Sequence, residues 1–125
     1  MDVYLIREAL KTAHVQAILS VVNDGFEATT FIDTADADLN APLPVLVLLD
    51  INLPKTSGDE VLEHLQQSQR CKHAQVLVVS SSDAPRDRAI TDRPNVVGYF
   101  KKPTDYNEFM KLGPLVRALL NTTTA

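Results

Sequence analysis

The strongest constraint on the fold is an aliphatic run, Val45 to Leu49, that ends in a single carboxylate, Asp50. An apolar run without alternation is typical of a strand buried on both faces, as in a parallel sheet covered by helices. Asp50 then lies at the carboxyl end of that strand, and open α/β sheets place their sites along this edge. The run therefore predicts an α/β fold and makes Asp50 a candidate nucleophile or metal ligand.

The rest of the chain alternates between helical and strand patterns. Apolar residues at helical spacing predict four helices, a strongly polar stretch is expected to form a fifth, short and weakly held helix, and short apolar runs predict three further strands. We expect helices at 2–12, 28–35, 57–65, 85–93 and 105–120, and strands at 17–22, 45–49, 75–79 and 96–100. The Gly113-Pro114 pair is expected to kink or interrupt the last helix, because proline removes a backbone donor. Strands alternating with helices predict parallel strands joined by right-handed crossovers.

The bulk composition indicates one cytoplasmic domain spanning residues 1–125. The net charge of -4 argues against binding to nucleic acid or to an anionic membrane surface. No stretch has the length of a membrane span, and no secretion signal is present. A lone cysteine, Cys71, excludes an internal disulfide, and with His73 it supplies too few ligands for a zinc site.

Three polar residues end three different predicted strands. Asp50, Ser80 and Lys102 each lie at a strand's carboxyl end or just beyond it. These ends are neighbours in a parallel sheet, so the three side chains are expected to share one site. A carboxylate nucleophile, a hydroxyl donor and an ammonium group suit phosphoryl transfer, which depends mainly on positioning and charge neutralisation.

Several segments in register resemble the receiver domain of bacterial two-component response regulators. They are residues 48–54, 57–58, 79–80 and 98–103, and the resemblance covers essentially all 125 residues. The insertion before Asp50 and the Asn52-Leu53-Pro54 segment after it look most like the single-domain group associated with phytochrome-type histidine kinases. The resemblance implies a flavodoxin-like, doubly wound parallel sheet. It also implies a phosphoacceptor that receives its phosphoryl group from a sensor histidine kinase or phosphotransfer protein.

The resemblance assigns a role to each matching residue of the site. Asp50 matches the phosphoacceptor and a magnesium ligand, and Asn52 matches the residue whose backbone carbonyl binds Mg²⁺. Ser80 matches the switch hydroxyl, and Tyr99 the aromatic residue whose rotamer follows phosphorylation. Lys102 matches the family's lysine. The residue after it, Pro103, matches a structural proline whose preceding peptide bond is usually cis in the family.

The beginning of the chain departs from the family pattern. Receivers begin with a strand that ends in two acidic residues, whereas residues 1–8 look like the family's first helix. The first strand and its acidic pair are therefore expected to be missing, which predicts weak Mg²⁺ binding. A lost start, a deliberate truncation, or a rearranged sheet would each explain this pattern. The rearrangement would place 17–22 beside 45–49 or pair two chains, so a homodimer through exposed strand edges, or through the last strand and helix, is also expected.

The predicted function is a phosphorylated signalling switch that acts on a downstream protein. It is not an enzyme beyond its own phosphorylation and dephosphorylation. The alternative is an unphosphorylated pseudo-receiver that serves as an interaction or dimerisation module. A phosphatase of the haloacid-dehalogenase type would require an acid where Asn52 stands, and a P-loop enzyme would require a Gly-Lys-Ser/Thr segment that the chain lacks.

Overall fold

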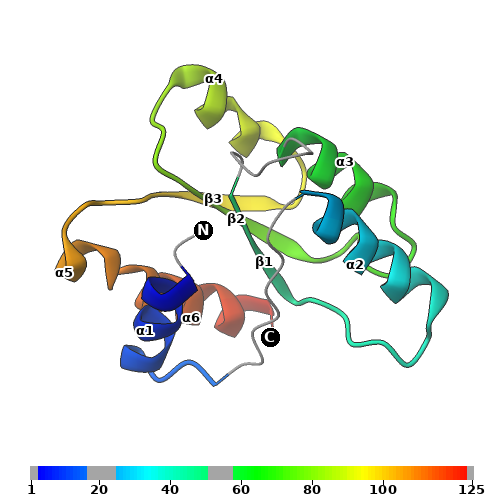
Figure 1. The fold of residues 1–125 in the computed structure, drawn as a ribbon, viewed down its shortest axis with the longest axis horizontal. Coiled ribbons are helices and arrows are strands. Elements are labelled where there is room, and N and C mark those ends of the chain that lie inside the picture. The colour runs from blue at the N-terminus through cyan, green and yellow to red at the C-terminus, as the bar shows by residue number, and fades with distance from the viewer. Residues whose placement is uncertain (1–2, 17–24, 51–57, 124–125) are drawn as a thin grey trace.

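The computed structural model describes residues 3–16, 25–50 and 58–123 and arranges them around a parallel sheet (Figure 1). The described elements follow one another along the chain as α1 Val3–Thr12, α2 Gly25–Ala37, β1 Leu46–Leu49, α3 Gly58–Gln67, β2 Gln75–Ser80, α4 Pro85–Arg88, the 3-10 helix η1 Ala89–Asp92, β3 Val96–Lys101, α5 Tyr106–Phe109 and α6 Leu112–Thr123. The predicted helices and the last three predicted strands are therefore found. The predicted strand 17–22 lies outside the described residues.

The described strands form a parallel sheet in the order β1-β2-β3, with β2 in the centre. Both faces of β2 are covered, because its side chains alternate between two hydrophobic clusters. Val76 and Val78 belong to one cluster, and Leu77 and Val79 belong to the other. All four side chains are fully buried. This strand lacks alternating polar residues because it is buried on both faces, as the sequence predicted.

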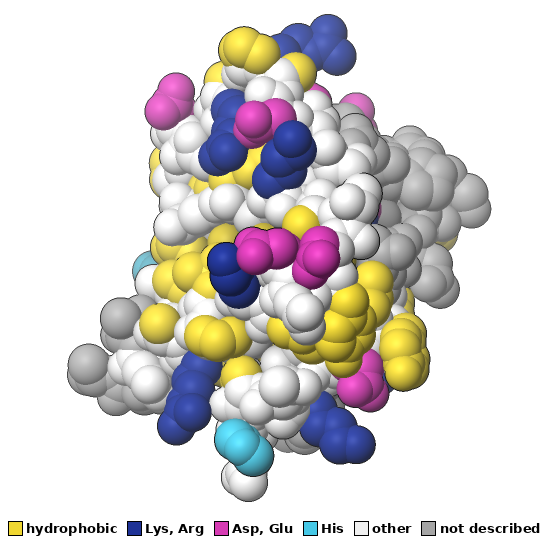
Figure 2. Space-filling model, turned by 90° about the vertical axis from the view of Figure 1, so that its left-hand side faces the viewer, with side chains coloured by type: hydrophobic (Ala, Val, Ile, Leu, Met, Phe, Trp, Pro, Cys, Tyr) yellow, Lys and Arg dark blue, Asp and Glu magenta, His cyan; other side chains and the backbone are white. Residues whose placement is uncertain are grey.

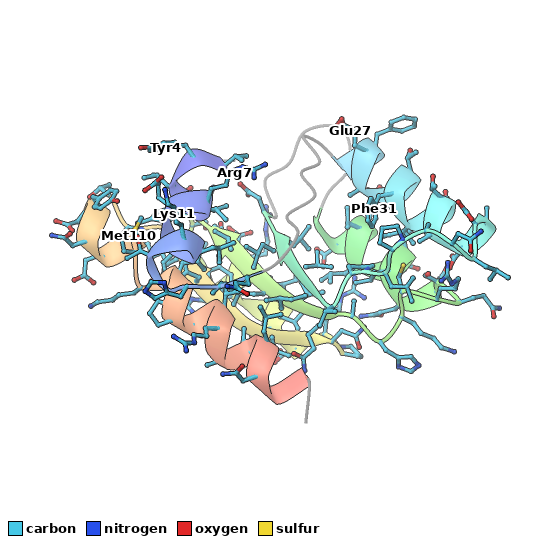
Figure 3. The ribbon with its side chains drawn as sticks, turned by 90° about the horizontal axis from the view of Figure 1, so that it is seen from below. Tyr4, Arg7, Lys11, Glu27, Phe31 and Met110 are labelled. Atoms are coloured by element: carbon cyan, nitrogen blue, oxygen red, sulfur yellow. The ribbon has the colours of Figure 1, made fainter. Side chains whose placement is uncertain are left out.

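Helices cover the sheet from both sides, as a doubly wound fold requires. The helices α2 and α3 and the 3-10 helix η1 contribute to the first cluster, whereas α1 and α6 contribute to the second. Figure 3 shows this separation: Tyr4, Arg7 and Lys11 lie on α1, whereas Glu27 and Phe31 lie on α2, across the sheet. No helix in the described part of the chain is long and apolar enough to cross a membrane.

The last strand contains a β-bulge that changes the direction of its side chains. Val76 pairs with Val96, but the next residue of β2, Leu77, pairs with Gly98. Val97 is therefore an extra residue in β3, and it is 40% exposed. Beyond the bulge the alternation is reversed, so Tyr99 packs with the first cluster, on the same face as Val96.

The last predicted helix is divided in two, but the division lies before Gly113-Pro114. The helix α5 ends at Phe109 and α6 begins at Leu112, so Pro114 occupies the first turn of α6. A proline is tolerated there because the first amides of a helix have no intrahelical acceptor. Asp105 is the N-cap of α5, because its side chain accepts a hydrogen bond from the Glu108 amide at 3.1 Å.

Candidate functional site

An ion pair between Asp50 and Lys102 forms the centre of the site. Asp50 directly follows β1, and Lys102 directly follows β3. The Lys102 Nζ donates to Asp50 Oδ2 at 2.8 Å, and the two side chains are only 14% and 12% exposed. A mostly buried carboxylate of this kind is stabilised by a paired cation. The structure therefore brings together the two charged residues that the sequence placed at one edge of the sheet.

Ser80 ends the central strand, between the strands that lead to Asp50 and Lys102. Its side chain is fully buried, and its backbone carbonyl accepts a 2.7 Å hydrogen bond from the Lys102 amide. This bond continues the β2–β3 ladder to the end of the sheet. The Ser80 hydroxyl oxygen also accepts a hydrogen bond from the Ser82 amide at 3.1 Å. Ser80 is thus connected both to the backbone of Lys102 and to the loop after β2.

Tyr99 is connected to the same loop from the neighbouring strand. Its phenol donates a 2.7 Å hydrogen bond to the Ser82 carbonyl. The bulge at Val97 permits this contact, because it directs Tyr99 to the face of the sheet that η1 covers. In the structure the two residues differ, since Val97 is the bulged, exposed residue and Tyr99 is half-buried.

Ser82 and Arg88 belong to the site although the sequence did not single them out. Ser82 is held through its amide and its carbonyl, and its hydroxyl donates to Asp87 and accepts from the Ala84 amide. The Arg88 guanidinium lies 4.5 Å above the centre of the Tyr99 ring. Serine and arginine in a polar stretch are ordinary surface residues. Only their position against β3 distinguishes them, and no pattern in the sequence shows that position.

An ion pair also connects Arg88 to the loop after β2. Its Nε donates to Asp83 Oδ1 at 2.7 Å. The hydrogen bond from Arg88, together with its positive charge, lowers the pKa of Asp83 below the usual value. Asp83 is therefore ionised at neutral pH. The loop after β2 and the short helix α4 are joined to β3 through these charged and aromatic contacts.

The peptide bond before Pro103 is trans, which corrects the expectation of a cis bond. The described residues contain no cis peptide bond. Three residues, 103–105, separate β3 and Lys102 from the start of α5, so the chain changes direction over several residues without a cis turn. A trans bond is also the more stable isomer for a residue before proline.

The described residues supply only part of a magnesium site. Asp50 offers a carboxylate, whereas Asn52 lies outside the described residues. Within the described ranges, no group of three or more His, Cys, Asp or Glu could hold a metal ion. Magnesium requires octahedral oxygen coordination, which one carboxylate does not provide. The described residues therefore supply one carboxylate ligand for the ion at this edge of the sheet.

Comparison with known proteins identifies the class of domain to which this arrangement belongs. The model of the response regulator receiver domain matches residues 2–112. The chain therefore belongs to the family of response regulator receiver domains. Among curated proteins it is similar to the response regulator Rcp1 of Synechocystis sp., with 32% identity over 111 residues, which cover 89% of this chain and 76% of that protein.

Solved structures support the same assignment. The phosphorylated cyanobacterial phytochrome response regulator RcpA is similar with a TM-score of 0.83 and 31% identity, over 97% of this chain and 87% of that one. The manganese-bound form of Rcp1 is similar with a TM-score of 0.79 and 31% identity, over 94% and 84% of the two chains. The predicted flavodoxin-like α/β fold is thus confirmed, as is the relationship to phytochrome-associated response regulators.

Proposed function

We propose that Asp50 accepts a phosphoryl group from a sensor histidine kinase or phosphotransfer protein and that the domain thereby switches a protein-binding surface. The observation that carries this proposal is the 2.8 Å contact between Asp50 Oδ2 and Lys102 Nζ, in which both side chains are mostly buried at the carboxyl edge of the sheet. Membership of the receiver family supports the same role. A buried ion pair often adds little net stability, because the desolvation of both charges opposes their attraction.

The chemistry follows from the three residues at the ends of the strands. An Asp50 oxygen attacks phosphorus, and the bond from phosphorus to the donor histidine nitrogen breaks, with its electron pair leaving on nitrogen. The Lys102 ammonium, already beside the carboxylate, neutralises charge on the phosphoryl oxygens. The Ser80 hydroxyl then donates to one of these oxygens. Apart from its own phosphorylation and dephosphorylation, the domain catalyses no reaction in this proposal.

Weak binding of Mg²⁺ is the second part of the proposal. Receiver domains bind Mg²⁺, and one similar structure is a manganese-bound form. The described residues here contribute the Asp50 carboxylate, and Asn52 is proposed to add its backbone carbonyl. Two protein oxygens leave most of the octahedral shell to water and to the phosphoryl group, so a low affinity is expected. A magnesium titration that is monitored by amide NMR measures this affinity directly.

Intact-mass spectrometry after incubation with acetyl phosphate and Mg²⁺ tests the proposed phosphoacceptor. Wild-type protein is expected to gain one phosphoryl group, and Asp50→Asn to gain none. Asp92→Asn, which makes the same chemical change at an exposed residue of η1, serves as the matched control and should be phosphorylated normally. Equal phosphorylation of Asp50→Asn and wild type would contradict the assignment of Asp50.

An unphosphorylated interaction module is the second candidate function, and exposed apolar side chains favour it. Val97 on β3, Tyr106 on α5 and Leu115 on α6 are 40%, 51% and 37% exposed. Figure 2 shows hydrophobic side chains beside both acidic and basic ones on the side of the molecule that carries α5. Light scattering of wild type and Val97→Asp distinguishes the functions. Dimerisation that is independent of acetyl phosphate and is lost in the variant would favour the module.

A further inference from the structure

Arg88 is held more firmly than an exposed arginine on a short helix usually is. It ends α4, which has four residues and buries none of them. Its side chain is 47% exposed, yet it has two partners, Asp83 and Tyr99. The guanidinium carbon lies 4.5 Å from the centre of the Tyr99 ring, and Nε donates to Asp83 at 2.7 Å. The ion pair holds the guanidinium group in place beside the aromatic ring.

Arg88 therefore stands at the end of a continuous series of contacts that leads to the phosphoacceptor edge. The ring that it covers belongs to Tyr99, whose phenol donates to the Ser82 carbonyl. The Ser82 amide in turn donates to the hydroxyl of Ser80, the residue at the end of the central strand. These three contacts connect Arg88 to Tyr99, Tyr99 to Ser82, and Ser82 to Ser80. A change in the orientation of Tyr99 consequently changes the loop that contacts Ser80.

We propose that Arg88 is a positioning residue of the switch, which holds Tyr99 in the orientation that bonds Ser82. This inference rests on the proposed function, because it assigns Arg88 to the control of the same site. A guanidinium group over an exposed aromatic face stabilises that arrangement by a modest amount. Loss of the contact should change the ratio of bonded to released Tyr99 by about two- to fivefold. Asp83 contributes indirectly, by keeping the guanidinium over the ring.

NMR of protein labelled with ¹³C on the tyrosine rings reports the environment of the Tyr99 ring. The chain has three tyrosines and no tryptophan, so the spectrum is simple, and Tyr99→Phe assigns the signal. Arg88→Ala should shift the Tyr99 ring resonances while those of Tyr4 and Tyr106 stay in place. Arg88→Lys, which keeps a cation, should restore the wild-type position in part. Asp83→Asn should produce a smaller shift than Arg88→Ala.

Arg86→Ala is the matched control, since Arg86 is an exposed arginine on the same short helix. It should leave the Tyr99 signals unchanged. Unchanged Tyr99 resonances in Arg88→Ala would overturn the inference, as would an equal shift in Arg86→Ala. The readout uses unphosphorylated protein, so it is independent of whether Asp50 accepts a phosphoryl group. Mass spectrometry of Asp50→Asn tests that separate question, and the two failures are therefore distinguishable.

Discussion

The phenol of Tyr99 donates a 2.7 Å hydrogen bond to the Ser82 carbonyl and so joins the last strand to the loop that follows the central strand. The same loop is bonded to the Ser80 hydroxyl through the Ser82 amide. A residue on β3 and the buried end of β2 thus share one short segment of backbone. We propose that this segment of backbone carries the effect of phosphorylation from the edge of the sheet to the surface.

Tyr99→Phe should weaken this loop without disrupting the core. The ring remains, but the Ser82 carbonyl loses its donor, so the free energy of unfolding should fall by about 0.5–1.5 kcal/mol. Urea unfolding measures the loss, and hydrogen exchange of the Ser82 amide should become faster. Tyr106→Phe is the matched control, because Tyr106 is an exposed tyrosine at the start of α5. Equal effects of the two variants would contradict a special role for the Tyr99 hydroxyl.

Lys102→Met should slow phosphorylation by acetyl phosphate about 10²-fold, since a single preorganised group that stabilises developing charge has an effect of this size. The Lys102 ammonium already lies 2.8 Å from the carboxylate of Asp50, the proposed nucleophile. The measurement is the rate of mass gain at a fixed donor concentration. Lys101→Met provides the control, because Lys101 is the neighbouring lysine but is exposed. A similar rate for wild type and Lys102→Met would show that the ion pair has only a structural role.

Gly113→Ala should destabilise the protein although alanine favours helices. A Cβ at this position would lie 2.2 Å from the Ala9 carbonyl oxygen and 2.8 Å from the Ala13 Cβ, so α1 and α6 must move apart. Overpacking of this kind costs about 1–3 kcal/mol, which exceeds the gain in helix propensity. Thermal or urea unfolding measures the loss.

Gly98→Ala is the matched control for this substitution. The nearest atom to its added Cβ is the flexible Leu77 Cδ1 at 3.2 Å, and a small rotation of that side chain can relieve the contact. The loss of stability should therefore be clearly smaller than for Gly113→Ala. If Gly98→Ala proved the more damaging variant, the close approach of α1 to α6 would not be the dominant constraint.

The contribution of Asp36 to stability should depend on pH. Its Oδ1 accepts hydrogen bonds from the Ser68 hydroxyl at 2.7 Å and the Arg70 amide at 3.0 Å. The Ser68 bond first, and the Arg70 bond second, lower the pKa of Asp36 from its usual 3.8. The folded state therefore binds this proton less readily than the unfolded chain does. The stabilisation is fully present above pH 3.8 and is lost as the pH falls through the lower pKa of the folded state.

Urea midpoints of wild type and Asp36→Ala at pH 7, 4 and 3 test this expectation. The variant should be less stable at neutral pH, and the difference should shrink below the usual carboxyl pKa. Asp92→Ala, on the exposed surface of η1, controls for the loss of one negative charge. A difference between wild type and Asp36→Ala that stays constant from pH 7 to pH 3 would contradict this account.

The sequence determined the α/β class and the residues that end its strands. The uninterrupted apolar runs before Asp50 and Ser80 were sufficient to predict buried strands. Only a strand that is covered on both faces lacks the alternation of apolar and polar residues. Since parallel strands end at one edge, the run before Asp50 and the one before Lys102 also predicted that these two side chains would meet. The N-cap at Asp105 was predictable for a similar reason, as capping depends on the nearest few residues.

The tertiary structure alone decided the direction of Tyr99 and the contacts of Arg88. A one-residue bulge at Val97 reverses the alternation of side chains between the two faces of β3. The bulge depends on the register between β2 and β3, which are distant in sequence. The close approach of α1 to α6 also depends on packing, since Gly113 has no Cβ to meet the Ala9 carbonyl. Local patterns identify which residues form a strand or helix. The register of a strand and the close approach of two helices depend on the partner element. They can therefore be determined only from the folded structure, in which both elements are present.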